Sequence, residues 1–231
     1  MDLNDLIMDS IVYPSKNVKA LCIYMLLSLI IGIVAVATGL TNTSKMAGLD
    51  VIVAFVGVIV LLALIFLVEG YVLDIVKFGI ERRNDAPEID FVRQATNGVK
   101  IFIISFVYMI IPTIILVLSG NNIVGIIISL ILFIVFGLFL SIAQCRLAES
   151  EEIADALNFK GVYDDIMAIG LTKVVLTIIV IAIITGCISA FVSGIFGILG
   201  NELLTAIVAS IIDIYLLFFG NRAVGLLYSD R

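Results

Sequence analysis

An aspartate in the last apolar segment is the residue best placed to do chemistry inside a membrane. Asp213 lies ten residues into an apolar run that begins near Leu203, which is about 15 Å along a helix and close to the middle of a bilayer. An ionised aspartate costs about 2.5–3.5 kcal/mol at that depth, so such a residue normally faces the bundle interior or water. Either Asp213 carries a proton or cation, or it is a protonated or hydrogen-bonded acid that locks helix packing.

Three more polar residues lie near the ends of apolar runs, at roughly equivalent places in the chain. They are Glu69, Gln144 and Asn221. They form either a polar ring at the mouth of a vestibule or the ordinary polarity of a membrane interface. Together with Asp213, these residues are the candidate ion, proton or buried polar site.

Small residues recur every four positions in the fifth apolar run. The positions are Ala182, Gly186, Ala190 and Gly194. This spacing places all four on one face of a helix, where small side chains let two helix backbones approach closely. The pattern predicts helix packing, with this helix either buried at the centre of the bundle or forming an interface between copies of the protein.

The residue types for enzymatic chemistry are sparse. The sequence has no histidine, and Cys22, Cys145 and Cys187 do not have the spacing of metal ligands. No pairing of a nucleophile with a base and no pair of carboxylates stands out. We therefore predict no catalytic residue, no metal site and no cofactor. The net charge of −6 does not favour a nucleic acid as a partner.

The elements that position these residues are membrane helices. The chain is 62% hydrophobic and only 14% charged, against roughly 25% charged in soluble domains. Continuously apolar runs of about 20 residues match the thickness of a bilayer as helices, whereas barrel strands alternate polar with apolar residues. The fold class is therefore an all-α integral membrane protein of about six transmembrane helices. The runs are Ala20–Leu40, Val51–Val72, Ile101–Leu118, Ile123–Ala143, Val174–Ile195 and Leu203–Ala223.

Basic residues set the predicted orientation. If the amino terminus is inside, twelve of the thirteen lysines and arginines fall on the cytoplasmic side, and only Lys45 falls outside. This asymmetry is the positive-inside rule. We expect a multi-pass protein of the cell (plasma) membrane, surrounded by the lipid bilayer, with both termini in the cytoplasm.

The chain also shows signs of an internal threefold repeat within a single membrane domain, residues 1–231. The units are residues 1–81, 82–155 and 156–231, each a polar or amphipathic stretch, a lysine and a helical hairpin. Lys19, Lys100 and Lys173 mark the register, although any hairpin protein that follows the positive-inside rule places lysines there. The amphipathic stretches, near residues 3–11, 89–95 and 153–169, are expected to be helices on the cytoplasmic side.

Two segments resemble a known family. One contains Gly70-Tyr71, then Pro87-Glu88, Asp90-Phe91 and Gly98; the other is Tyr13-Pro14 before the first span, and residues 154–159 add a weaker likeness. With these features the chain resembles a largely archaeal family of polytopic membrane proteins known as domain of unknown function 4013. The resemblance implies a polytopic membrane fold, and it carries over no activity and no catalytic residue.

Two hypotheses for function remain. The first is a non-enzymatic membrane scaffold or partner subunit, which binds another protein or a second copy of itself and uses its cytoplasmic-side helices and the loop Lys77–Arg93 as its docking surface. The second is a transporter or channel for a small solute or ion that uses Asp213. The lack of other charge inside the spans favours the first, and Asp213 favours the second.

Overall fold

The computed structural model describes residues 1–37, 49–120, 122–198 and 202–231. Within these ranges the chain is helical and has no strand, so the predicted all-α class is confirmed. The helices are α1 (Leu3–Lys16), α2 (Val18–Ala37), α3 (Leu49–Ile80), α4 (Phe91–Ser119), α5 (Ile123–Ser150), α6 (Ile153–Ala156), α7 (Phe159–Ile169), α8 (Leu171–Ile198) and α9 (Glu202–Tyr228).

Six of these helices, α2, α3, α4, α5, α8 and α9, are long and apolar enough to cross a membrane. A bilayer core about 30 Å thick needs roughly 20 helical residues, and each of the six supplies close to that number or more. The chain is therefore a multi-pass membrane protein. The spans are Val18–Ala35, Ile52–Ile80, Phe91–Ser119, Ile123–Ser150, Leu171–Phe196 and Ile207–Tyr228.

Helix α4 starts well before the apolar run from which it was predicted. The Asp90 carboxylate caps it, accepting hydrogen bonds from the backbone N–H groups of Val92 and Arg93, both at 3.1 Å. No helix-breaking residue separates this cap from the apolar run. The amphipathic stretch expected after Pro87 is therefore the first part of α4, and the prediction of a separate surface helix there is wrong.

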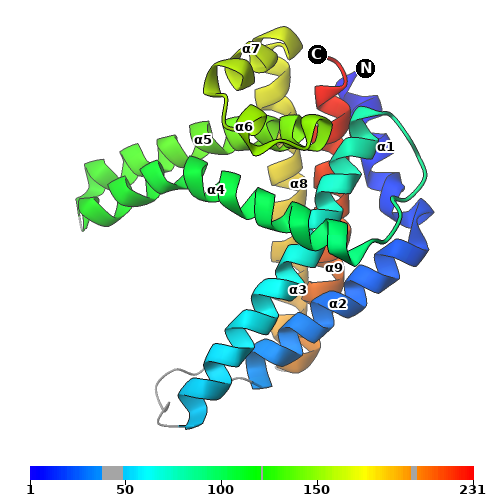
Figure 1. Ribbon diagram of the computed structural model, residues 1–231, viewed down its shortest axis with the longest axis vertical. Helices are drawn as coiled ribbons and strands as arrows, with labels where there is room; N and C mark the ends of the chain where they lie inside the picture. The colour runs from blue at the N-terminus through cyan, green and yellow to red at the C-terminus, as the bar shows by residue number, and fades with distance from the viewer. Residues whose placement is uncertain (38–48, 121, 199–201) are drawn as a thin grey trace.

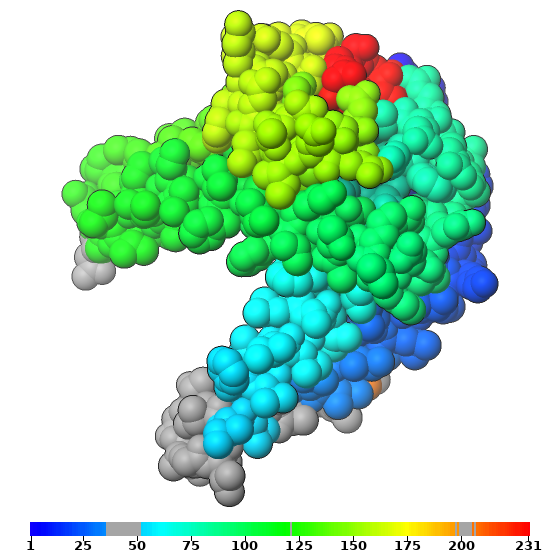
Figure 2. Space-filling model, in the orientation of Figure 1, coloured from blue at the N-terminus to red at the C-terminus, as the bar shows by residue number. Residues whose placement is uncertain are grey.

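The short helices lie together at one end of the molecule, beside both termini (Figure 1). We call residues 1–16, 81–93, 151–170 and 222–231 the polar end. From it, the α2–α3 pair and the α4–α5 pair run in clearly different directions (Figure 1), and Figure 2 shows a wide notch between them. The α2–α3 pair and the α4–α5 pair therefore pack against each other closely only near the polar end, whereas α4 and α5 stay side by side (Figure 1).

The hydrophobic core lies where α3, α5 and α9 meet one another. Val76, Ile142 and Leu227, one from each helix, are almost fully buried there. Farther from the polar end, apolar side chains such as Phe55 and Leu118 are exposed. Exposed apolar surface on these halves suits helices that are surrounded by lipid, which is as apolar as the side chains themselves.

Two glycines bring α3 and α4 into backbone contact. A Cβ atom at Gly70 would lie 1.8 Å from the carbonyl oxygen of Gln94, and one at Gly98 would lie 2.0 Å from the carbonyl oxygen of Phe66. Any side chain at either position would force the helices apart. Helix α2 is joined to the same part of α4, because the Tyr24 hydroxyl of α2 donates a 2.6 Å hydrogen bond to Oε1 of Gln94. Both glycines belong to the features that carry the family resemblance, and their role is close helix packing.

Candidate functional site

A groove of about 500 Å³ opens between α5, α8 and α9. It exists because α8 packs closely against α9 but touches α5 only weakly. Apolar side chains of α8 and α9 line part of it, and polar side chains from all three helices line the rest. These polar residues are Ser141, Gln144, Thr185, Asp213 and Asn221.

Asp213 is exposed in this groove. Its carboxylate accepts a hydrogen bond of 3.4 Å from the hydroxyl of Ser189 on α8. It lies nine residues before Arg222 in α9, about 14 Å of helix rise from the polar end. Asn221, nearer that end, donates its side-chain N–H to the carbonyl of Leu217 at 2.9 Å. The groove therefore runs from the polar end toward the middle of the spans.

The structure brings together three of the four polar residues singled out in the sequence. Gln144, Asn221 and Asp213 share the groove, whereas Glu69 lies half-buried on α3 and is not among the groove-lining residues. Sequence position alone could not separate these cases, because all four residues occur near or within apolar runs.

The small-residue face of α8 is not packed within the described part of the chain. Ala182 lines the groove, and Gly186, Ala190 and Gly194 are exposed. A Cβ atom at Gly186 or Gly194 would meet no heavy atom within 4 Å. In this structure α8 is therefore not the buried central helix that the pattern allowed. Its role as an interface with another molecule stays a prediction.

The most enclosed charge is Arg222, which is 1% exposed and joins α9 to α1 and to the loop after α3. Its Nε donates to the Asp9 carboxylate at 3.1 Å, and its Nη1 donates to the carbonyls of Phe78 at 3.1 Å and Arg83 at 2.5 Å. Its Nη2 donates to Oδ1 of Asn84 at 3.1 Å. A buried guanidinium is tolerated only when its donors are satisfied in this way.

The ring of Tyr13 on α1 covers the Arg222 guanidinium, with the Arg222 Cζ 4.7 Å from the ring centre. Burial raises the pKa of the Tyr13 hydroxyl to about 12, although Arg222 opposes the change. Tyr13 is therefore neutral near pH 7. Tyr13-Pro14 is one of the features that carry the family resemblance, and the role of Tyr13 there is to pack against Arg222.

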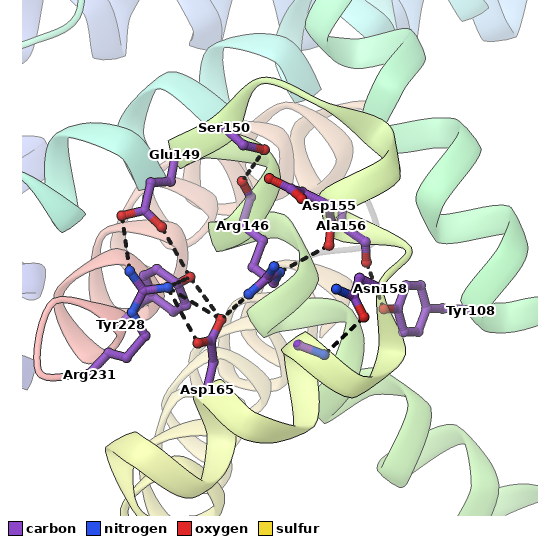
Figure 3. A network of polar contacts seen from close by, with 11 residues as sticks. Tyr108, Arg146, Glu149, Ser150, Asp155, Ala156, Asn158, Asp165, Tyr228 and Arg231 are labelled. Atoms are coloured by element: carbon purple, nitrogen blue, oxygen red, sulfur yellow. Dashed lines mark hydrogen bonds and ion pairs between the residues drawn. The ribbon is translucent and has the colours of Figure 1, made fainter.

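A second network centres on Asp165 of α7 (Figure 3). Arg146 of α5 donates to it at 2.7 Å, and the hydroxyl of Tyr228 at the end of α9 donates at 3.0 Å. Arg231 contacts Asp165 at 3.4 Å and pairs with Glu149 at 3.1 Å. These contacts hold α7 and Arg231 against the last turns of α5 and α9.

The two ends of the chain meet at Asp230 (Figure 1). Its carboxylate pairs with the amino-terminal ammonium of Met1 at 3.1 Å, with Arg82 at 2.6 Å and with Lys173 at 2.7 Å. Burial acts to raise the pKa of Asp230, but the hydrogen bonds from Lys173 and the terminal ammonium outweigh it, so the pKa is lowered. The carboxylate is therefore ionised and paired at neutral pH.

Three ion pairs involve the three central helices, α3, α5 and α9. In each, a charged residue of one central helix pairs with a residue at or just before the start of another pair of spans. α3 binds the start of α4, α5 binds α7, and α9 binds α1, which closes the set into a ring. The pairs are Asp74–Arg93 at 3.0 Å, Arg146–Asp165 at 2.7 Å and Arg222–Asp9 at 3.0 Å. The arrangement is compatible with a threefold repeat, which itself stays a prediction.

Sequence reasoning missed these pairs, since it counted Arg146 and Arg222 among the basic residues that set the orientation and assigned neither of them an acidic partner. A usable signal was present for Arg222, because six small or apolar residues, Ala223–Tyr228, follow it. An arginine inside such a run must be paired. Its partner was not readable, since Asp9 lies 213 positions away in the sequence.

The polar side chains of the groove are groups that can bind a charged or polar partner. Among the described residues, no three histidine, cysteine, aspartate or glutamate side chains gather as metal ligands. Many charges at the polar end are engaged in ion pairs, whereas the groove offers a carboxylate, amides and hydroxyls on an open surface. That donor set suits a cation or a basic side chain.

Comparison with known proteins identifies the family of this membrane protein. No curated protein and no solved structure matches the chain. A family model described as "Protein of unknown function (DUF4013)" matches residues 53–201, which run from within α3 through α8. This range is well over half of the 231 residues. The chain therefore belongs to the DUF4013 family of proteins of unknown function.

Proposed function

We propose that the protein is a non-enzymatic membrane scaffold or partner subunit of the cell membrane, with both termini and the polar end in the cytoplasm. The observation that carries the proposal is the ring of ion pairs that fastens the helix pairs together at one end. Such a ring holds a surface in a fixed shape, which is what docking requires. The concentration of basic residues at this end supports its cytoplasmic placement.

The docking surface is the loop after α3 together with the first turn of α4. Arg222 and Asp230 hold this loop in place through Arg83 and Arg82 respectively. Beside it, Val92 is 80% exposed, a large apolar side chain on a surface otherwise rich in charge. An apolar residue with a charged rim is typical of the centre of a protein interface.

Site-specific photocrosslinking tests this proposal. A photoreactive amino acid at Val92 should give discrete protein adducts in native membranes. The matched control is Val117, which is 73% exposed on the same helix but far from the polar end, and it should react mainly with lipid. Lipid adducts alone from Val92 and from a second loop position, Arg83, would contradict a docking role. Cysteines placed at Glu88 and Ser44 should label from opposite sides of the membrane, which tests the orientation.

Transport of a small ion or solute is the second candidate, because the groove brings Asp213, Gln144 and Asn221 together. Purified protein in liposomes provides the test. Flux that is present for the native chain and lost in Asp213→Asn would favour transport over the scaffold. Equal background leakage for the two proteins across a panel of ions and protons would leave the scaffold as the better account.

A further inference from the structure

The seam between α5 and α8 is a place beside the three central helices, α3, α5 and α9, where a polar-lined groove replaces close packing. In the described part of the chain, α4 packs against both α3 and α5, and α2 packs against both α3 and α9. α8 packs against α9 but scarcely touches α5, and the 500 Å³ groove lies there. α8 therefore differs from α2 and α4, each of which packs against two of the central helices.

Asp213 has no cationic partner within the described part of the chain. The charged groups on the three helices around the groove are engaged elsewhere: Arg146 with Asp165, Arg222 with Asp9, and Lys173 with Asp230. The remaining contact of the carboxylate is the Ser189 hydroxyl. A carboxylate at this depth needs a cation or water around it.

We propose that this groove seats a transmembrane helix of a different protein, one that presents a lysine or arginine at the depth of Asp213. The inference rests on the proposed role as a partner subunit and names the chemistry of the partner. The basic side chain neutralises Asp213, and the amides of Gln144 and Asn221 receive polar groups nearer the membrane surface. The arrangement joins two groups that would each be costly alone in lipid.

The neighbouring face of α8 allows such a helix to come close. Ala182 is shared by the groove and the small-residue face, and Gly186 continues that face with open space in front of it. Small residues permit helix axes to approach, and the hydroxyl of Thr185 lies on the groove wall to bond across the contact.

A second copy of this chain fits less well than a different protein. In a copy inserted the same way up, the arginine of α9 lies about 14 Å of helix rise from the level of Asp213 and is already paired with Asp9. Two copies facing each other across this groove would instead oppose two Asp213 side chains. The charge requirement therefore selects a foreign helix.

Binding of designed helices in nanodiscs tests the proposal. The probes are single-span leucine–alanine peptides that carry lysine, leucine or glutamate at the centre, with a fluorophore that reports energy transfer to a label on Cys187. We expect the lysine peptide to bind native protein about tenfold more tightly than the leucine peptide, the size of effect that interhelical polar contacts give. Asp213→Asn should remove this preference, and Asp213→Glu should keep it.

Controls separate the groove from general effects. Asp164→Asn, at an exposed acid on α7 away from the groove, should leave the preference unchanged, and Ala182→Leu should weaken all three peptides by filling the groove. Equal binding of lysine and leucine peptides, or a preference that survives Asp213→Asn, would overturn the proposal. Energy transfer between two copies that depends on Asp213 would overturn it in favour of self-association. None of these outcomes changes the result of crosslinking from Val92, so the scaffold proposal is tested separately by that experiment.

Discussion

Replacing Arg222 with methionine should destabilise the protein more than any other single change at the polar end. Methionine keeps much of the side-chain volume but leaves Asp9 without its cation and the carbonyls of Phe78 and Arg83 without donors. Removing one partner of a buried ion pair costs about 3–5 kcal/mol. Asp9 retains 28% of its side-chain exposure and thus some water, so we expect a loss of about 3–4 kcal/mol, toward the lower end of that range.

A buried cysteine provides the assay. Cys145 is 0% exposed and its sulfur lies 3.7 Å from the carbonyl oxygen of Val224. Once the exposed Cys22 and Cys187 are replaced by alanine, a thiol-reactive dye reports only on separation of α5 from α9. Titration with a denaturing detergent then gives the free energy of unfolding, and Arg222→Met should react with the dye at a much lower detergent fraction.

Two further variants show whether the hydrogen bonds or the charge alone is responsible. Arg222→Lys keeps the charge but has three donors in place of five, so we expect it to lose about 1–2 kcal/mol. The double variant Arg222→Met with Asp9→Leu removes both charges and should recover part of the loss, because no carboxylate is left unpaired. An Arg222→Met protein as stable as the native chain, or no more damaged than Arg222→Lys, would refute this account of the network.

Three other predictions concern packing and charge. The pKa of Asp230 is lowered in the folded protein. Its ion pairs therefore stabilise the fold above the pKa that Asp230 has in the unfolded chain, and this stabilisation is lost as the pH falls through its pKa in the folded protein. Thermal stability measured by circular dichroism should therefore drop below about pH 4. That drop should be smaller in Asp230→Asn. Gly70→Ala should destabilise the protein by about 1–3 kcal/mol or more, because its Cβ would lie 1.8 Å from the Gln94 carbonyl oxygen. Gly186→Ala, where a Cβ meets nothing within 4 Å, should leave the dye assay unchanged or slightly improved.

The parts of the fold that follow from the bilayer were predictable from the sequence. Six helices of sufficient length were readable because lipid requires continuous apolar runs. The helices of the structure contain those runs, apart from residues 38–40 of the first run, which lie outside the described residues. Their ends were less predictable, since a cap such as Asp90 extends α4 into polar sequence that periodicity alone assigned to a surface helix. Hydrogen bonding of the backbone, not hydropathy, decides where such a helix begins.

The candidate site was predictable only in part, for a different reason. Asp213 was found because a single acid at mid-membrane depth is costly wherever it faces. Its association with Gln144 and Asn221, and the separation of Glu69 from them, depends on how α5, α8 and α9 are arranged. Arrangement in lipid follows from the shapes of facing helix surfaces, which one sequence without contacts does not supply.

Lipid offers apolar helices little reason to prefer one rotation or depth over another, because side chains lose no water when they meet. In this protein the register of the central helices is instead set at the polar end, where an Arg222, Arg146 or Asp74 side chain reaches one specific partner. Setting the register at one end leaves the far halves of the helix pairs free to diverge, as they do in Figure 1. Because the ion pairs at the polar end hold the fold together, a seam between α5 and α8 can stay open. A fixed polar end with an unfilled seam below it is the geometry that a partner subunit needs, since the seam can accept a foreign helix without disturbing the contacts that define the fold.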